Sequence, residues 1–321
     1  MAEQEKYLYG PVPSRRLGLS LGVDVVPFKV CTLDCIYCQI GSTTEKTVER
    51  KEYVPIKAVL AELRQRVEHG LRADFVTMSG SGEPTLHSRL GELIDAIRNI
   101  TDIAVAIVTN GTLLYRQDVR ADCLKADVVL PSLDAADEPT FRRVNRPHAD
   151  ISAERLISGL CAFRDEYPGQ IWLEVLLVEG VNTSDEQIAR IKEAIERIRP
   201  DKVQLNTAVR PAADVGVRPV DVGKLEAIAA VLGDRCEVVG GFSRSGCGSL
   251  AESRAQDVLS MLKRRPCSLD DICSGLNIGR NEALKYVTDL RDRQVIHSEL
   301  RDGVTFFKAV SQGGGGPEVG R

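Results

Sequence analysis

Short runs of apolar residues alternate, from about residue 20 to residue 240, with segments whose apolar residues recur every three or four positions. Most positions in the short runs are apolar in succession, which is typical of strands covered on both faces. Because each periodic segment would form a helix with one apolar stripe, the alternation predicts βα units around a parallel sheet. The expected strands are 21–26, 75–79, 103–109, 128–132, 171–178 and 203–206, and the expected helices are 56–68, 90–97, 153–163 and 185–198.

The pattern changes near residue 253. Three helices and then two strands, at 295–298 and 304–308, are expected downstream, in an order that resembles a winged helix-turn-helix. We therefore expect a large α/β domain over 1–245, a winged-helix-like domain over 252–311 and a glycine-rich flexible tail over 312–321. Apolar residues mark the three helices (Val258, Leu259, Leu262; Leu269, Ile272, Leu276; Ala283, Val287, Leu290), and Arg301, Asp302 and Gly303 mark the hairpin turn between the strands.

The composition is that of a globular protein. The 321 residues suffice for one large domain and a small one, and 43% hydrophobic with 27% charged residues exclude general disorder and a coiled coil. The net charge of -4 provides no overall attraction for nucleic acid or an anionic membrane, so any such binding has to be local. The first residues show no apolar signal segment, and no run of about 18 apolar residues follows. We therefore expect a cytoplasmic protein without a membrane partner.

Three of the nine cysteines are closely spaced, because only three and two residues separate Cys31, Cys35 and Cys38. A loop with this spacing turns three thiolates toward one point, as soft metals and iron–sulfur clusters require. Three cysteines on a four-iron cluster would leave one iron open for a substrate or cofactor, which implies chemistry. The alternative is a zinc site completed by a distant side chain, with His87, Cys123 and His148 as candidates.

The other cysteines form weaker patterns. Cys123 and Cys161 lie in helical stretches and are most simply core residues. The less favoured interpretation of the last four is a second cluster, since their steps of 11, 20 and 6 match no compact ligand pattern; they are Cys236, Cys247, Cys267 and Cys273.

The segment CTLDCIYC, which includes Tyr37, resembles the CxxxCxxC motif of the radical S-adenosylmethionine (SAM) superfamily, and the resemblance extends over residues 7–240. It implies a partial (β/α)6 TIM-like barrel in which Cys31, Cys35 and Cys38 hold a [4Fe-4S] cluster whose open iron binds SAM. It also implies an enzyme that reductively cleaves SAM to a 5'-deoxyadenosyl radical, which abstracts hydrogen from a substrate. A flavodoxin or ferredoxin would donate the electron. Tyr37 would pack near the adenine or serve as an ordinary core aromatic.

A glycine-rich segment follows the second expected strand, at the rim where a barrel builds its active site. Glycines there let the backbone approach a ligand closely. The segment resembles the GGE motif of the superfamily, although a serine stands where glycine is commoner. The resemblance implies that Gly80, Ser81, Gly82 and Glu83 lie near the methionine amino group of SAM.

Polar residues also follow the third and fourth expected strands. Asn110, Ser132 and Asp134 look like the contacts to the ribose and carboxylate of SAM, although each alone is typical of a turn or a helix cap. Arg143 or Arg146 would hold the SAM carboxylate bidentately, and the alternative for both is a solvated surface arginine.

Three further charged residues need an explanation. Glu174 interrupts an apolar run, where a charge needs a partner or faces a functional interior. Arg15 and Arg16 lie upstream of the cysteines and suit an anionic group such as phosphate, or form a surface pair.

The substrate is less clear from the residues. The opening YGPVPSRRLG and the stretch FRRVNRPH look most like iron–sulfur oxidoreductases related to wyosine synthase, a tRNA-modifying enzyme, which makes a nucleic-acid base a candidate substrate. The segment 252–308 has ten Lys/Arg against nine Asp/Glu, a poor phosphate-binding face, so a protein-docking or lid role is as plausible there. Two alternatives remain: an activase that installs a glycyl radical on a partner protein, and a redox-sensing DNA-binding regulator.

Overall fold

The computed structural model describes residues 7–14, 16–208, 212–214, 216–239, 249–264, 266–276, 278–301 and 304–310. The chain divides into two compact units, residues 1–246 and residues 247–321, and each is described by itself.

The described residues of the first unit form an eight-stranded sheet in the order β1-β2-β5-β6-β7-β8-β9-β10. All neighbouring strands from β2 onward are parallel, whereas β1 pairs with β2 in the antiparallel sense. The predicted α/β fold with a parallel, partial barrel is thereby confirmed. The strands are β1 (Leu8–Ser14), β2 (Gly18–Val23), β5 (Phe75–Met78), β6 (Ala104–Thr109), β7 (Val128–Pro131), β8 (Gln170–Leu177), β9 (Lys202–Thr207) and β10 (Cys236–Val238).

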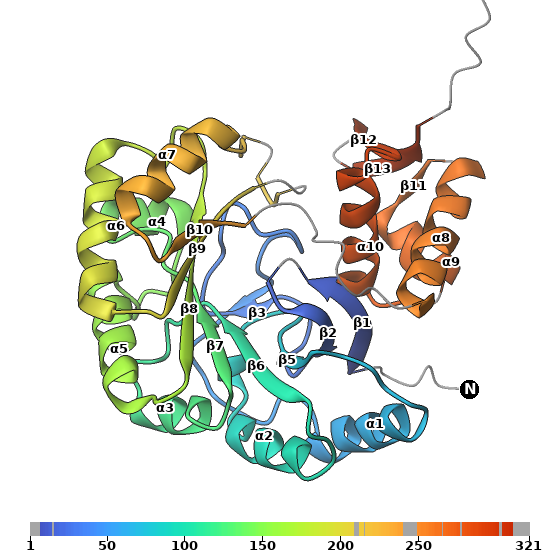
Figure 1. The fold of residues 1–321 in the computed structure, drawn as a ribbon, viewed down its shortest axis with the longest axis horizontal. Helices are drawn as coiled ribbons and strands as arrows, with labels where there is room; N and C mark the ends of the chain where they lie inside the picture. The colour runs from blue at the N-terminus through green and yellow to red at the C-terminus, as the bar shows by residue number, and fades with distance from the viewer. Residues whose placement is uncertain are drawn as a thin grey trace, which may run out of the picture. The chain divides into compact units, whose positions relative to one another are not determined.

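Helices line the outer side of this curved sheet (Figure 1). In α6 (Asp185–Ile198) the residues Ile188, Ile191, Ile195 and Ile198 are buried, as their spacing predicts, and Ser184 caps the helix by accepting a hydrogen bond from the Gln187 backbone N–H. The other helices of this unit are α1 (Ile56–Glu68), α2 (Leu90–Arg98), α3 (Gln117–Cys123), α4 (Glu138–Asn145), α5 (Ala153–Glu166) and α7 (Val222–Leu232), with a short 3-10 helix at Pro84–Leu86.

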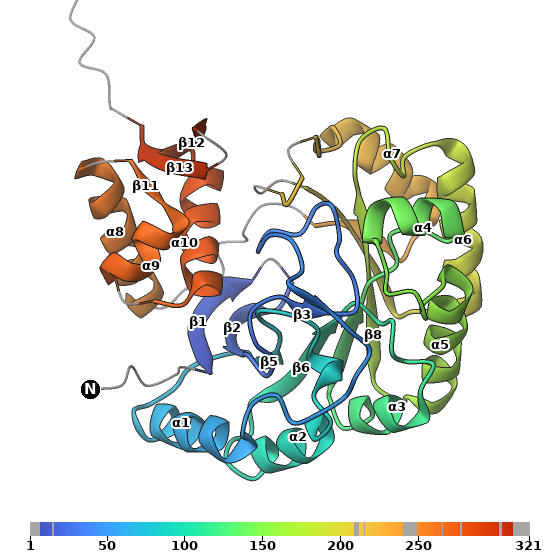
Figure 2. The same ribbon diagram turned by 180° about the vertical axis from the view of Figure 1, so that it is seen from behind.

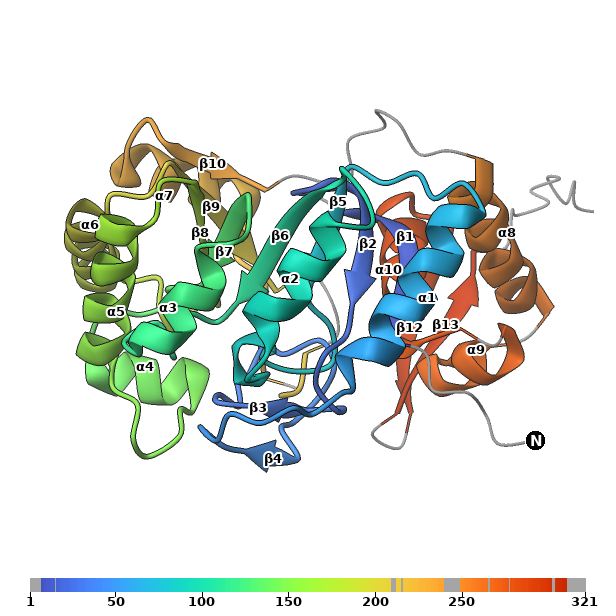
Figure 3. The same cartoon turned by 90° about the horizontal axis from the view of Figure 1, so that it is seen from below.

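The segment between β2 and α1 carries the closely spaced cysteines and a small parallel pair of strands, β3 (Val30–Cys31) and β4 (Glu45–Lys46). It lies inside the curve of the sheet, on the side away from the helices (Figures 1 and 2). Figure 3 shows the pair β3 and β4 at one end of the sheet strands. Since β2, β5, β6, β7 and β8 are parallel, the loops that follow them all open toward this same end.

Among the described residues of the second unit, three helices and two strands lie where the sequence predicts them, and the short strand β11 (Cys267–Ser268) is not predicted. Its sheet has the order β11-β13-β12 with antiparallel pairs. Asp302, Gly303 and the tail 312–321 lie outside the described residues. The elements are α8 (Ser249–Arg264), β11 (Cys267–Ser268), α9 (Leu269–Leu276), α10 (Arg280–Asp292), β12 (Ile296–Arg301) and β13 (Val304–Ala309).

Candidate functional site

Two of the three closely spaced thiols, Cys31 and Cys35, have side-chain amide donors inside the curve of the sheet. The Asn110 side-chain amide, directly after β6, lies 3.5 Å from the Cys31 Sγ, and the Asn145 amide, at the end of α4, lies 3.3 Å from the Cys35 Sγ. The thiols are close enough that a charge on Cys38 raises the pKa of both Cys31 and Cys35. The predicted cysteines therefore lie near one another, with donors from the loop after β6 and from the end of α4 facing two of them.

Burial dominates the electrostatics of Cys31 and Cys35. It raises the pKa of Cys31 to about 12, and the nearby Glu83 carboxylate adds to the increase. Burial also raises the pKa of Cys35 well above its usual range, with the Asp134 carboxylate as the next cause. Ionisation of Cys31 and Cys35 is therefore disfavoured without a compensating positive charge, which metal coordination would provide.

The donor set, three thiols in one segment, is of the ligand type that an iron–sulfur cluster requires. Within the described part of the chain, no three His, Cys, Asp or Glu side chains converge as around one metal ion. A cluster needs its thiolate ligands further apart than a single ion does, because each binds a different iron. Both ring nitrogens of His87 are engaged, by the Val54 carbonyl at 2.9 Å and by the Arg89 N–H at 3.2 Å, so His87 is not free to complete a zinc site.

The loop after β5 fastens the cysteine segment. The Glu83 backbone N–H donates to the Val30 carbonyl at 3.0 Å, and the Lys29 N–H donates to the Ser81 carbonyl at 2.7 Å. A Cβ on Gly82 would lie 1.9 Å from the Val30 carbonyl oxygen, so only glycine permits this approach. The Ser81 N–H and hydroxyl donate in turn to Asp24.

Glu83 joins this loop to the next one. Its buried carboxylate accepts hydrogen bonds from the Thr85 N–H at 3.1 Å, the Thr109 hydroxyl at 2.5 Å and the Asn110 N–H at 2.8 Å. Burial raises the pKa of Glu83 despite these donors. The carboxylate thus positions the loop that carries Asn110, and its contact with the SAM amino group stays a prediction.

Tyr37, Asp134 and Asn145 form a buried network beside Cys35. The Tyr37 hydroxyl and the Asn145 amide both donate to Asp134, the second at 2.7 Å, and the Leu176 N–H donates to Asp134 at 2.9 Å. Burial raises the pKa of Asp134 to about 6. Ser132, two residues earlier, is only partly buried and pairs through its backbone with β8.

Comparison with known proteins identifies this arrangement. Residues 25–191, about half of the chain, match the radical SAM superfamily. A protein of Methanocaldococcus jannaschii in the group UPF0026 is 37% identical over 234 residues, which are 72% of this chain and 72% of that protein. The chain belongs to the radical SAM superfamily. Its members are enzymes that use a [4Fe-4S] cluster and SAM.

Other relatives of this radical SAM protein differ in length and name. A protein of Brachyspira hyodysenteriae named "GTPase Obg" is 35% identical over 305 residues, which are 94% of this chain but 45% of that protein, so the chain spans less than half of it. The solved "Structure of TYW1 with a lysine-pyruvate adduct bound" has a TM-score of 0.51 at 21% identity and covers 70% of this chain and 74% of its own, which shows likeness of fold.

Two more distant relatives carry names of reactions. A "Probable GTP 3',8-cyclase" of Methanothermobacter thermautotrophicus is 28% identical over 152 residues, 47% of each chain. A "Probable dual-specificity RNA methyltransferase RlmN" of Chlorobaculum tepidum is 22% identical over 177 residues, 52% of this chain and 46% of that protein. No helix among the described residues is long and apolar enough to cross a lipid bilayer.

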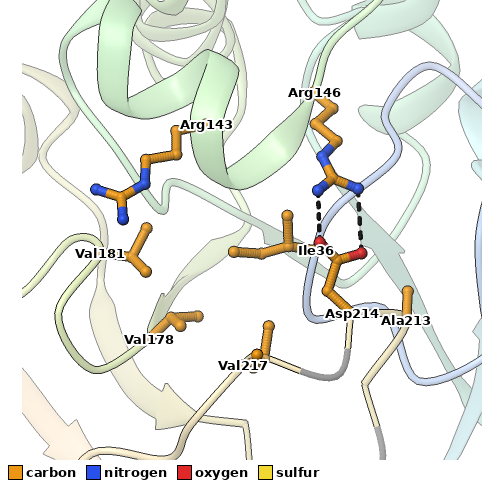
Figure 4. Close-up of a pocket in the computed structure, with 9 residues that line it drawn as sticks. Ile36, Arg143, Arg146, Val178, Val181, Ala213, Asp214 and Val217 are labelled. Carbon is orange, nitrogen blue, oxygen red and sulfur yellow. Dashed lines mark hydrogen bonds and ion pairs between the residues drawn. The ribbon is translucent and has the colours of Figure 1, made fainter.

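A pocket of about 440 Å³ opens beside the cysteine segment (Figure 4). The two predicted arginines line it but differ in their partners. Arg146 forms two hydrogen bonds with Asp214, whereas Arg143 has no hydrogen-bond or ion-pair partner among the described residues. No sequence pattern indicates Asp214. The apolar lining comes from Ile36, Val178, Val181, Ala213 and Val217, and Gly216 completes the pocket.

The remaining predicted residues have structural partners. Glu174 pairs with Arg16 and accepts a hydrogen bond from the Asn206 amide at 3.1 Å, which explains the charge within β8. Arg15 lies outside the described residues. Cys123 is buried and Cys161 partly buried, whereas Cys247 of the discounted second cluster lies outside the described residues.

Proposed function

We propose that this protein holds a [4Fe-4S] cluster through Cys31, Cys35 and Cys38 and binds SAM at the open iron. When bound and reduced, the cluster would supply the electron for reductive cleavage of SAM, and the resulting 5'-deoxyadenosyl radical would abstract hydrogen from a substrate. The observation that carries the proposal is the grouping of the three thiols in one segment, two of them facing amide donors, at the end of the sheet where the strand loops open.

We expect different residues around the thiols to contact different parts of SAM. Gly80, Ser81 and Gly82 shape the rim nearest the cysteine segment, and Glu83 fixes that rim to the next loop. Asn110, Ser132 and Asp134 line the following strand ends, where ribose hydroxyls would find donors and acceptors. Tyr37, held by Asp134, would form one wall for the adenine.

Arg143 is the better candidate of the two arginines for the SAM carboxylate. Arg146 already has a carboxylate partner in Asp214, so binding another would require that pair to break. Arg143 has no such partner to lose, and its guanidinium lies at the edge of the apolar pocket (Figure 4). A bidentate contact from it would orient SAM beside Ile36 of the cysteine segment.

We propose that the substrate is a nucleic-acid base within an RNA molecule. Support comes from the names of two relatives, one a GTP cyclase and one an RNA methyltransferase. A low-potential flavodoxin or ferredoxin would supply the electron, in the cytoplasm, where thiols stay reduced.

The second unit has the element order of a winged helix, and we propose that fold for it. Two of its basic side chains already have carboxylate partners, since Arg280 pairs with Asp270 and Arg293 with Asp289, which leaves these two less available to phosphate. We therefore expect RNA affinity to survive the change of Arg280 and Lys285 to glutamate, as measured by salt-dependent binding. A loss of affinity would instead assign α10 to RNA.

Anaerobic turnover tests the main proposal. Reconstituted protein with SAM and dithionite should release 5'-deoxyadenosine, and total tRNA should increase the rate more than GTP does. No 5'-deoxyadenosine under any condition would contradict enzyme status and favour a redox-sensing regulator. Stimulation by GTP alone would replace RNA with a free nucleotide, and stimulation only by a partner polypeptide would favour an activase.

A further inference from the structure

Lys29 is the only buried lysine among the described residues, with 2% of its surface exposed. Its Nζ donates to the Cys38 Sγ at 3.0 Å. In the described part of the chain, this ammonium has no carboxylate partner at ion-pair distance. A buried cation is costly unless an opposite charge compensates it, so this position requires an explanation.

The backbone holds Lys29 in place. Its φ of 58° is in the left-handed region, which is unusual for a residue other than glycine. The N–H donates to the Ser81 carbonyl at 2.7 Å, and the carbonyl accepts from the Thr44 and Glu45 N–H groups at 3.1 and 3.3 Å. Hydrogen bonds from both sides therefore direct the side chain inward, and a strained, over-determined backbone of this kind is common at functional sites.

We propose that Lys29 is the counter-cation of the iron–sulfur cluster and raises its reduction potential. The inference rests on the proposed ligands Cys31, Cys35 and Cys38. The one hydrogen bond to the Cys38 Sγ compensates the ammonium only in part, whereas the thiolates around a bound cluster would supply the opposite charge. Reduction by a one-electron donor adds one negative charge to the cluster and its thiolates, so a fixed cation stabilises the reduced state more than the oxidised state. Hydrogen bonds to cluster sulfurs act in the same direction.

The test compares Lys29→Met with Lys46→Met. Lys46 lies opposite Cys31 in the β3–β4 pair, but it is exposed and its Nζ donates to the Arg146 carbonyl, so it is a matched control for charge and location. Redox titration of reconstituted protein, followed by the electron paramagnetic resonance of the reduced cluster, gives the potential. We expect Lys29→Met to disfavour the reduced state at least tenfold, a shift of 59 mV to more negative potential. Lys46→Met should match the wild type, and Lys29→Arg should recover most of the shift.

Thermal melting of the cluster-free protein distinguishes an effect of Lys29 on the reduction potential from a structural role of Lys29 in the fold. If Lys29 serves the cluster, cluster-free Lys29→Met should melt no lower than the wild type, because the substitution removes a poorly compensated buried charge. A lower melting temperature, or failure to fold, would assign Lys29 to the fold and overturn the proposal, as would an unchanged potential at full iron content. If the wild type binds no iron, the ligand assignment itself fails. The two failures are distinguishable, because the reduction potential can be measured only in protein that holds the cluster.

Discussion

Gly82→Ala tests the contact between the loop after β5 and the cysteine segment. A Cβ at residue 82 would lie 1.9 Å from the Val30 carbonyl oxygen, where real contacts are essentially never below 3.0 Å. The two backbones must separate by about 1 Å, since neither is a flexible side chain, and such overpacking costs about 1–3 kcal/mol. The Glu83 N–H would lose its hydrogen bond to Val30, and the neighbouring Cys31 would move with the segment.

Iron content and denaturant unfolding measure both consequences. We expect Gly82→Ala to retain less than half of the wild-type iron and sulfide after anaerobic reconstitution and to unfold at lower urea concentration. Gly216→Ala is the control, because a Cβ there meets no atom within 4 Å. If Gly82→Ala keeps full iron content and wild-type stability, the loop does not position the cysteine segment, and the packing argument is wrong.

Three more predictions concern residues near this loop and the pocket. Gly22→Ala would bring a Cβ to 2.0 Å from the Tyr9 ring, so the free energy of unfolding should fall by about 1–3 kcal/mol in urea; unchanged stability would show that the ring moves aside freely. Burial raises the pKa of Asp24 from 3.8 to about 6. Between these two pH values the folded state binds more protons than the unfolded state, so the wild type loses stability as the pH rises through this range. Cluster-free Asp24→Asn should therefore gain roughly 2–3 kcal/mol over the wild type between pH 4 and pH 7, and a constant difference would contradict this. Arg143→Ala should weaken SAM binding about 10- to 100-fold by calorimetry with little change in stability, whereas Arg142→Ala should not, and equal affinities would remove Arg143 from the site.

Much of the barrel is predictable because its elements have strong patterns. The buried strands are continuous apolar runs, and the stripe of α6 has the helical period, so both are visible without tertiary information. The strand β1 is missed, since LYGPVPS contains two prolines; it is tolerated as a strand because it lies at the sheet edge. The helix α4 is missed because EPTFRRVN is short and polar.

Contacts of α4 show why its helical state needs tertiary structure. The Asp34 and Ile36 N–H groups donate to the carbonyls of Asn145 and Val144, so the end of α4 supports the cysteine segment. Phe141 and Val144 provide its buried face. Local propensity contains none of this information, because the cysteine segment is about a hundred residues earlier in the chain.

The sequence predicts which residue types form the candidate site but not which of these residues contact one another. Parallel strands bring their carboxyl ends to one edge, so Asn110 and Asp134 are expected there from position alone. That Asn145 faces Cys35, or that Lys29 is buried against Cys38, depends on how loops fold over one another. Asp214 is missed for the same reason, because only its contact with Arg146 in the folded chain indicates a role for it.

The most direct test of the central claim is an anaerobic count of iron and sulfide, with 5'-deoxyadenosine release, for single alanine variants of Cys31, Cys35 and Cys38. Cys161→Ala, a partly buried cysteine on α5, is the matched control. The wild type and the control should hold about four irons and cleave SAM, and each of the three variants should lose both properties. Full iron content and SAM cleavage in any of the three would contradict the assignment of these thiols as the cluster ligands.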